Sequence, residues 1–268
     1  MKNKPVMSGL MKPIAAALLL ALLFSFIMKE KEKPVFYIIG DSTVRNGDGT
    51  GRDRLWGWGS FMADHFDTNK ISIRNHAIGG RSSRTFITEG RWDKVAAVLN
   101  KGDYVIMQFG HNDGGALDDT ARARGSIKGT GEESKEIYNP IMKKQEVVHT
   151  YGWYMRRYIR ETKDKGAIPI VCSPIPRNDW KDGKVMRSTE SYTKWARDVA
   201  KEEGAYFIDL NELVALKYEE MGEDQVKPFF PGDHTHTNID GAKLNAEIII
   251  NAIKEIKPGK LKKYISDK

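Results

Sequence analysis

Ser42 is the residue whose surroundings most clearly suggest chemistry. It lies in the segment 40–44, Gly-Asp-Ser-Thr-Val, directly after an apolar run that ends at Gly40. A glycine there lets the chain turn sharply, so the serine would stand at the start of the next element, where backbone N–H groups are free. Because Asp and Ser are also ordinary turn and cap residues, this segment by itself is weak evidence for a nucleophile.

The segment 231–237, near the carboxyl end of the chain, offers a base for that serine. A serine hydroxyl is a poor nucleophile unless a base removes its proton and a third group orients the base. An Asp three residues before a His can reach its ring across one turn of backbone, so Asp233 and His236 predict such a pair. His234 is the alternative base, because residues two apart share a face in an extended loop. An Asp-x-x-His spacing also suits a metal site, which would need further ligands from elsewhere.

Two other segments offer hydrogen-bond donors. Gly79 and Gly80 would let the backbone approach a ligand closely, and Asn112 carries a side-chain NH₂. Each has an ordinary structural interpretation as well. The glycine pair could form a tight turn before a helix, and Asn is common in turns.

The elements that must position these residues follow from the apolar pattern. Short runs that are apolar throughout are typical of parallel strands covered by helices on both faces, and longer amphipathic stretches separate them. The alternation predicts a right-handed, doubly wound α/β sandwich, whose strands share one carboxyl edge where ligands bind. We expect strands at 35–39, 71–75, 104–109, 168–172 and 206–210, and helices at 89–99, 145–163, 189–203 and 239–256.

The long segment 113–140 has no strand pattern and is rich in Gly, Asp, Arg and Lys. Long connections without regular structure in a folded domain are usually functional or disordered. Because this one follows the third predicted strand, we expect a loop that faces the substrate, with a mobile surface loop as the alternative.

The two ends of the chain differ from its body. Residues 1–33 contain an apolar run from 14 to 28 behind several lysines, which predicts an export signal or an uncleaved N-terminal anchor. Each end carries a net charge of +4, so the +7 of the chain leaves about −1 for residues 34–253. This distribution disfavours nucleic-acid binding. We therefore expect one domain at 34–257 and a solvated basic tail at 258–268.

The chain contains one cysteine, Cys172, inside an apolar run. A single cysteine excludes an intramolecular disulfide and a metal site built from several cysteines. We interpret Cys172 as a buried thiol of the core.

Taken together, these motifs resemble the SGNH (GDSL) hydrolase superfamily, and within it the rhamnogalacturonan acetylesterase-like carbohydrate esterases. The resemblance extends from about residue 34 to 256 and rests on Gly-Asp-Ser at 40–42, the Gly-Arg-Ser-x-Arg-x-Phe run at 80–86, Gly-x-Asn-Asp at 110–113, Ser-Pro-Ile-Pro-Arg-Asn at 173–178 and Asp-His-Thr-His-Thr at 233–237. It implies a flavodoxin-like three-layer α/β/α fold with a five-stranded parallel sheet, and hydrolysis of acyl esters. The Gly-x-Ser-x-Gly elbow of other α/β-hydrolases is absent from the sequence, which agrees with the resemblance.

The resemblance also implies roles for the residues above. Ser42 would be the nucleophile, Asp233 and His236 its partners, and the N–H groups of Ser42, Gly80 and Asn112 the oxyanion hole. This chemistry needs no metal and no organic cofactor.

The expected substrate is an acetylated polysaccharide, most of all rhamnogalacturonan. Cationic side chains in the loops would suit a polyanion, and we assign substrate contacts to Arg81, Arg177 and His234. A deacetylase of another glycan such as xylan, and a catalytically silent glycan-binding domain, are the alternatives; a lipid esterase fits less well. The cationic loop residues considered are Arg81, Arg84, Arg122, Arg124, Lys128 and Arg177.

Overall fold

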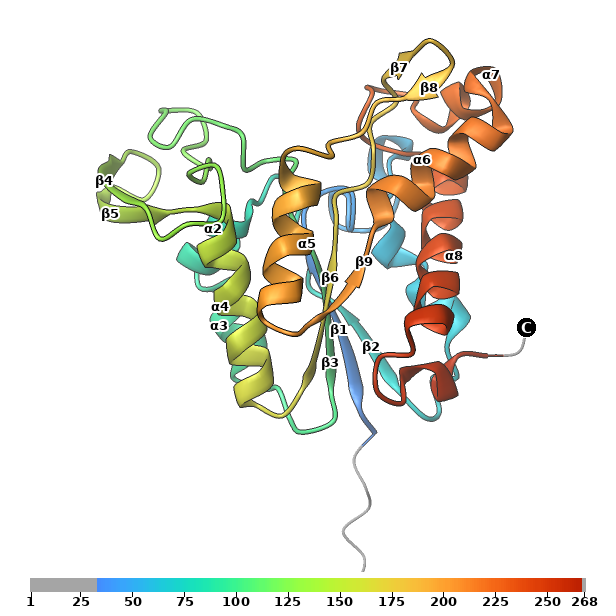
Figure 1. The fold of residues 1–268 in the computed structure, drawn as a ribbon, viewed down its shortest axis with the longest axis horizontal. Helices are drawn as coiled ribbons and strands as arrows, with labels where there is room; N and C mark the ends of the chain where they lie inside the picture. The colour runs from blue at the N-terminus through green and yellow to red at the C-terminus, as the bar shows by residue number, and fades with distance from the viewer. Residues whose placement is uncertain (1–32, 267–268) are drawn as a thin grey trace, which may run out of the picture. The chain divides into compact units, whose positions relative to one another are not determined.

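A computed structural model describes residues 33–266, and at its centre lies a five-stranded parallel sheet in the order β2-β1-β3-β6-β9 (Figure 1). Each predicted strand is present, and the fifth is shorter than expected. The α/β class is therefore confirmed. The strands are β1 (Val35–Gly40), β2 (Ser72–Asn75), β3 (Tyr104–Gln108), β6 (Ile168–Cys172) and β9 (Tyr206–Ile208).

Alternate residues of the central strands enter two separate hydrophobic cores. Phe36 and Ile38 of β1 pack into one core, and Tyr37 and Ile39 into the other. A strand that buries both faces needs helices on both sides, which is why its sequence is apolar throughout. The three-layer α/β/α sandwich is confirmed. Its helices are α2 (Ser83–Thr88), α3 (Arg91–Ala96), α4 (Tyr151–Asp164), α5 (Tyr192–Glu202), α6 (Leu210–Met221), α7 (Glu223–Val226) and α8 (Ile239–Ile256), with short 3₁₀ turns at Arg52–Arg54, Trp58–Ser60, Met62–His65, Lys227–Phe229 and Leu261–Tyr264.

The structure of segment 113–150 differs from two predictions, the loop at 113–140 and the start of the helix at 145–163. β4 (Ser134–Asn139) and β5 (Lys144–His149) form an antiparallel hairpin, which Figure 1 shows at the side of the sheet, and α4 begins only at Tyr151. Both hairpin strands are largely exposed, so they carry many charged residues and little of the apolar alternation that marks a strand. Thr150 caps α4 by accepting a hydrogen bond from the Trp153 amide, which fixes the helix start.

Two other helix predictions are wrong in detail. The predicted helix 89–99 is shorter than expected: α3 begins only at Arg91, because Gly90, with a left-handed φ of 68°, separates it from α2, which was not predicted. Helix α6, which follows β9 directly, was not predicted. Its apolar residues include the exposed Leu213 and Leu216, so no clear amphipathic stripe marks it.

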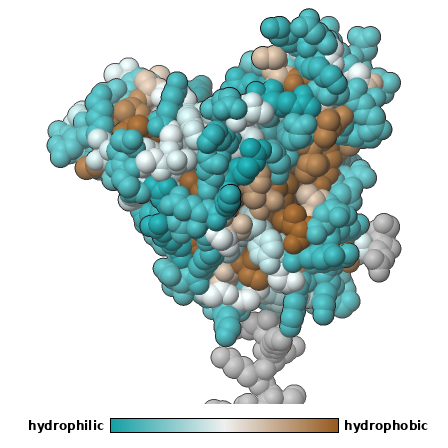
Figure 2. Space-filling model, in the orientation of Figure 1, coloured by the Kyte–Doolittle hydropathy of each residue, from teal (hydrophilic) through white to brown (hydrophobic). Residues whose placement is uncertain are grey.

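A second, two-stranded hairpin consists of β7 (Trp180–Lys181) and β8 (Lys184–Val185), near α6 and α7 (Figure 1). Apolar surface gathers over α6 and α8 in Figure 2. Two leucines of α6, Leu213 and Leu216, are exposed.

Residues 258–266 do not form the solvated tail that was predicted for 258–268. Leu261 is fully buried in the core, and the Ser266 amide donates to the carbonyl oxygen of His65. The predicted signal or anchor at 1–33 lies outside the described residues, apart from Lys33. Within 33–266, no helix is long and apolar enough to cross a membrane.

Cys172 ends β6 and is fully buried, as the sequence indicated. Burial raises the pKa of its thiol well above the ordinary value.

Candidate active site

Ser42 lies on the turn that follows β1. Gly40 is required there, because a Cβ on this residue would stand 2.6 Å from the carbonyl oxygen of Gln108. The next residue, Asp41, accepts hydrogen bonds on its Oδ1 from the amide and the hydroxyl of Thr43, at 2.9 and 2.7 Å. This closed turn fixes Ser42 at the carboxyl edge of the sheet, half-buried. Within the described chain, its amide donates to no protein acceptor.

His236 is the histidine that contacts the serine. Its Nε2 lies 2.8 Å from the Ser42 Oγ, and its Nδ1 lies 2.6 Å from Oδ2 of Asp233. A carboxylate only accepts hydrogen bonds, so Nδ1 carries the proton and Nε2 is free to accept one. The three side chains thus form one continuous hydrogen-bonded chain.

The Asp233 carboxylate is held by more than the ring. Its Oδ1 also accepts from the backbone amides of Thr235 and His236, at 2.6 and 2.8 Å. Partial burial works to raise the pKa of this carboxyl, but these hydrogen bonds outweigh it and lower the pKa to about 2. Asp233 is therefore ionised at any pH at which the protein would work.

The alternative base, His234, lies elsewhere. Its Nδ1 contacts Oδ1 of Asp179 at 2.7 Å, and its Nε2 lies 3.3 Å from a guanidinium nitrogen of Arg177. The Asn178 amide donates to the His234 carbonyl, so this residue fastens the 231–237 loop to the segment after β6. The two histidines point to different partners, although they are two positions apart.

Gly80 and Asn112 line the same cavity as Ser42. Gly80 has φ = 77°, a conformation that suits glycine, and its amide donates to no acceptor within residues 33–266. The side-chain NH₂ of Asn112 donates one hydrogen to the Arg81 carbonyl at 2.9 Å, which orients the amide. An NH₂ group has two hydrogens, so the second is free for a ligand.

Asp113, the last residue of the Gly-x-Asn-Asp motif, is a buried group that holds two segments together. Its carboxylate accepts from the amide and hydroxyl of Ser83 and from the hydroxyl of Ser126. These bonds join the start of α2 to the turn after β3. Burial raises the pKa of Asp113 to about 6, and burial raises that of Asp41 to about 6 as well.

The cavity at the Ser42 hydroxyl, which we call the catalytic pocket, has a volume of about 380 Å³. Three arginines line it: Arg122, Arg124 and Arg177. None of them pairs with a carboxylate in residues 33–266, and no acidic side chain lines this pocket. The remaining lining residues are Ser42, Asn46, Gly47, Gly79, Gly80, His111, Asn112, Thr235 and His236.

The other cationic residues have different roles. Arg81, expected to contact the substrate, donates to Glu89 at 3.0 Å and is not among the residues that line the catalytic pocket. Arg84 is fully buried and pairs with Glu146 of β5 at 2.7 Å. Its guanidinium also donates to the carbonyl oxygens of Leu117 and Gly125, so it fastens the 113–150 segment to α2. Spacing along the chain does not reveal such partners.

Asn46 and Thr235 line the catalytic pocket and were not predicted to. Their nearness in sequence to Ser42 and His236 is the signal that could have found them. No group of three or more His, Cys, Asp or Glu side chains in the described chain is arranged to hold a metal ion.

Comparison with known proteins identifies relatives of this chain. Residues 38–244 match the profile of the GDSL-like Lipase/Acylhydrolase family. The chain is 35% identical to the rhamnogalacturonan acetylesterase of Emericella nidulans, over 81% of this chain and 83% of the relative. It is 32% identical to a probable rhamnogalacturonan acetylesterase of Bacillus subtilis, over 82% of this chain and 92% of the relative.

A solved structure of another Bacillus subtilis protein has a similar fold. The TM-score is 0.67 at 26% identity, and the match covers 83% of this chain but 56% of that one.

Proposed function

The chain belongs to the GDSL-like lipase/acylhydrolase family, and from that premise we propose that it is a serine esterase that removes O-acetyl groups from rhamnogalacturonan. The observation that carries the proposal is the unbroken chain from Asp233 through His236 to Ser42, beside free donors at Gly80 and Asn112. A domain that only bound glycans would have no use for this arrangement.

The first step forms an acetyl-enzyme. The Ser42 Oγ attacks the acetyl carbonyl carbon while Nε2 of His236 takes its proton. Asp233 keeps the ring in the correct tautomer and stabilises the imidazolium that forms. Its low pKa serves this role, because the carboxylate stays charged throughout.

The tetrahedral oxyanion forms where the donors point. The amides of Ser42 and Gly80 and the free N–H of Asn112 receive its negative charge. The sugar hydroxyl then leaves with the proton from His236, and water releases acetate from Ser42 by the reverse sequence. Water is the only co-substrate of the complete reaction.

The charge of the catalytic pocket supports an anionic substrate. Arg122, Arg124 and Arg177 face it without carboxylate partners in the described chain, and guanidinium groups bind carboxylates well. A galacturonate carboxylate fits this requirement, and the two curated relatives bear the name of a galacturonate polymer. We further propose that the enzyme is exported and takes part in pectin degradation.

Acetate release from acetylated rhamnogalacturonan, compared with acetylated xylan, tests the proposal. We expect faster release from the first, and faster release from xylan would overturn the substrate assignment. Glycan binding without acetate release would instead identify a silent binding domain.

Alanine substitutions of the two histidines test which of them is the base. His236→Ala should abolish acetate release, whereas His234→Ala should retain much of it. The opposite result would mean that the wrong histidine had been assigned as base.

A further inference from the structure

The segment 116–125, which we call the arginine loop, carries two of the three arginines of the catalytic pocket. Arg122 is exposed and Arg124 is half-buried, and both line the cavity at the Ser42 hydroxyl. A guanidinium nitrogen of Arg124 lies 3.4 Å from the carbonyl oxygen of Gly80, the residue whose amide belongs to the proposed oxyanion hole. The conformation of this loop therefore decides where positive charge stands relative to the ester.

The base of the arginine loop is fastened to the rest of the domain. The Gly125 amide donates to the Ala116 carbonyl at 2.9 Å. The buried guanidinium of Arg84 donates to the carbonyl oxygens of Leu117 and Gly125, both at 2.8 Å. A side chain at position 125 would clash with the carbonyl oxygen of Gly115, so the two ends of the loop lie in close contact. The ends are thus fixed independently of the tip.

The tip of the loop is held by one side chain, that of Asp119. Its Oδ1 accepts from the amides of Ala121 and Arg122, at 2.9 and 2.7 Å, and its Oδ2 accepts from the Ala123 amide at 3.0 Å. Within the described chain, residues 118–124 make no backbone–backbone hydrogen bond. The three bonds to Asp119 therefore order this stretch of backbone.

The same bonds support an unfavourable backbone conformation. Ala123 has φ = 43°, in the left-handed region that strains any residue with a side chain, and it is almost fully buried. This bend lies between Arg122 and Arg124. If the bend relaxed, both arginines would move relative to the catalytic pocket.

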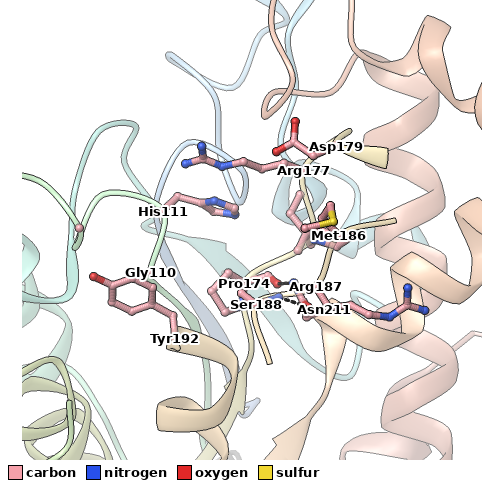
Figure 3. A pocket seen from close by; sticks show the side chains of 13 residues that line it. Gly110, His111, Pro174, Arg177, Asp179, Met186, Arg187, Ser188, Tyr192 and Asn211 are labelled. Carbon is pink, nitrogen blue, oxygen red and sulfur yellow. Dashed lines mark hydrogen bonds between the residues drawn. The ribbon is translucent and has the colours of Figure 1, made fainter. Parts of the chain in front are cut away.

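Arg177, the third arginine of the catalytic pocket, is positioned separately. It belongs to the segment after β6, and one of its guanidinium nitrogens lies 3.3 Å from Nε2 of His234. Figure 3 shows its side chain extending towards the segment that carries His111. A disordered arginine loop should therefore leave Arg177 in place, so that some attraction for an anion remains.

We propose that Asp119 is a positioning residue for substrate specificity, whose hydrogen bonds place Arg122 and Arg124 where they bind the carboxylate of a uronate substrate. Asp119 does not line the catalytic pocket, so it acts through the two arginines. The inference rests on the proposed function, because it assumes a substrate that carries a carboxylate beside the acetyl ester.

The negative charge of Asp119 makes the proposal easy to contradict. A carboxylate near two arginines opposes the binding of an anion. If Asp119 were no more than such a charge, its removal would strengthen binding of a uronate substrate and lower KM. If it orders the loop, its removal lets the two guanidinium groups disperse and raises KM. The two roles predict changes of opposite sign.

Asp119→Ala and Asp119→Asn remove the same charge but differ in hydrogen bonding. Asparagine keeps an oxygen that can accept from the Ala121 and Arg122 amides, whereas alanine keeps no acceptor. On acetylated rhamnogalacturonan oligosaccharides, we expect kcat/KM to fall about tenfold in Asp119→Ala, mainly through KM, the effect of losing one hydrogen bond to a charged group. Asp119→Asn should lose clearly less. On p-nitrophenyl acetate, which has no carboxylate, both variants should change far less.

Asp67→Ala is the matched control. Asp67 is also half-buried and accepts from a backbone amide two residues on, that of Asn69 at 3.1 Å, but it does not line the catalytic pocket. This variant loses the same charge and should keep wild-type kinetics on both substrates. Circular dichroism and the melting temperature check that all variants fold.

Three results would overturn the role of Asp119. The first is a KM for the oligosaccharides that is unchanged or lower in Asp119→Ala. The second is an equal loss on p-nitrophenyl acetate, and the third is an equal loss in the alanine and asparagine variants. If the wild type releases acetate from both substrates and one of these results is found, the esterase assignment stands and the Asp119 inference fails. If the wild type releases acetate from neither, both proposals fail.

Discussion

The catalytic pocket and a neighbouring cavity of about 320 Å³, the side pocket, share His111 and Arg177 in their walls, yet their other arginines differ in whether a carboxylate pairs with them. Arg124 in the first has no carboxylate partner in the described chain, whereas Arg187 in the second is held by two glutamates. Both cavities contain arginine, so counting charges would not separate them. The difference teaches that the charge available to a ligand depends on the partners of each side chain and not on the residue type.

Among the substitutions that test the catalytic pocket, the one at Ser42 should have the largest effect on activity. Ser42→Ala should lower kcat on every acetyl ester by at least about 10⁴-fold, because the nucleophile and its partners act as a unit. The melting temperature should change little, since the side chain is small and half-buried. Acetate release assays measure the effect, and near-wild-type hydrolysis would contradict the mechanism.

Asn112→Ala tests the donor side of the catalytic pocket. Loss of one oxyanion donor typically lowers kcat by roughly 10²–10³-fold, with a smaller change in KM. Steady-state kinetics would separate the two constants. Asn69→Ala, at an exposed turn, is the matched control and should behave like the wild type. A change confined to KM would assign Asn112 to substrate binding instead.

Arg124→Ala tests whether unpaired charge sets the preference of the catalytic pocket. We expect about a tenfold loss of kcat/KM on uronate oligosaccharides, the range of a hydrogen bond to a charged group, and a far smaller loss on p-nitrophenyl acetate. Arg160→Ala removes an exposed arginine that is paired with Glu203 on the outside of the domain, and it should leave both rates unchanged. Equal losses on both substrates would indicate a general structural role for Arg124.

The same contrast between paired and unpaired groups applies to the buried carboxylate of Asp41. One of its carboxylate oxygens is buried without a partner in the described chain, whereas the carboxylate of Asp179 in the side pocket is paired. Burial raises the pKa of Asp41 to about 6, above the value near 4 expected in the unfolded chain. Between pH 4 and 6 the folded state therefore binds the extra proton, and the contribution of Asp41 to stability falls as the pH rises.

Asp41→Asn should remove this pH-dependent cost. Relative to the wild type, the variant should gain stability above pH 6, on the order of 1–3 kcal/mol, and lose the advantage near pH 4. Denaturant unfolding across this pH range measures the difference. Asp64→Asn, at an exposed position, is the control. A gain that is independent of pH would show that the charge is not its cause.

The part of the site that sequence could predict depends on local rules. Ser42 and Asn112 each follow an apolar strand, and parallel strands end at the same edge of a sheet, so both residues could be predicted to lie at that edge. The pairing of β1 with β3, which makes them neighbours there, is seen only in the structure. Local spacing did not decide between His234 and His236, because that choice depends on which partner each ring contacts; the family resemblance pointed to His236, which does contact Ser42. Asp179 and Ser42 lie far from the histidines in sequence.

The side pocket and the β4–β5 hairpin illustrate a second limit. Met186 lies after a short hairpin with no strong pattern, and nothing in its spacing places it beside His111. The hairpin is exposed on most of its residues, so the apolar alternation that would reveal it is weak. Contacts between residues that are distant in sequence determine these features. Local sequence patterns do not reveal such contacts.

Arg84 has a consequence for how this chain could be shortened, in evolution or by design. A deletion of the 113–150 segment would remove Glu146 and the carbonyl oxygens that Arg84 bonds, and would strand a guanidinium in the interior. An uncompensated buried charge is strongly destabilising, so the deletion and a replacement of Arg84 would have to arrive together. We therefore expect homologues that lack the 113–150 segment to lack Arg84 as well.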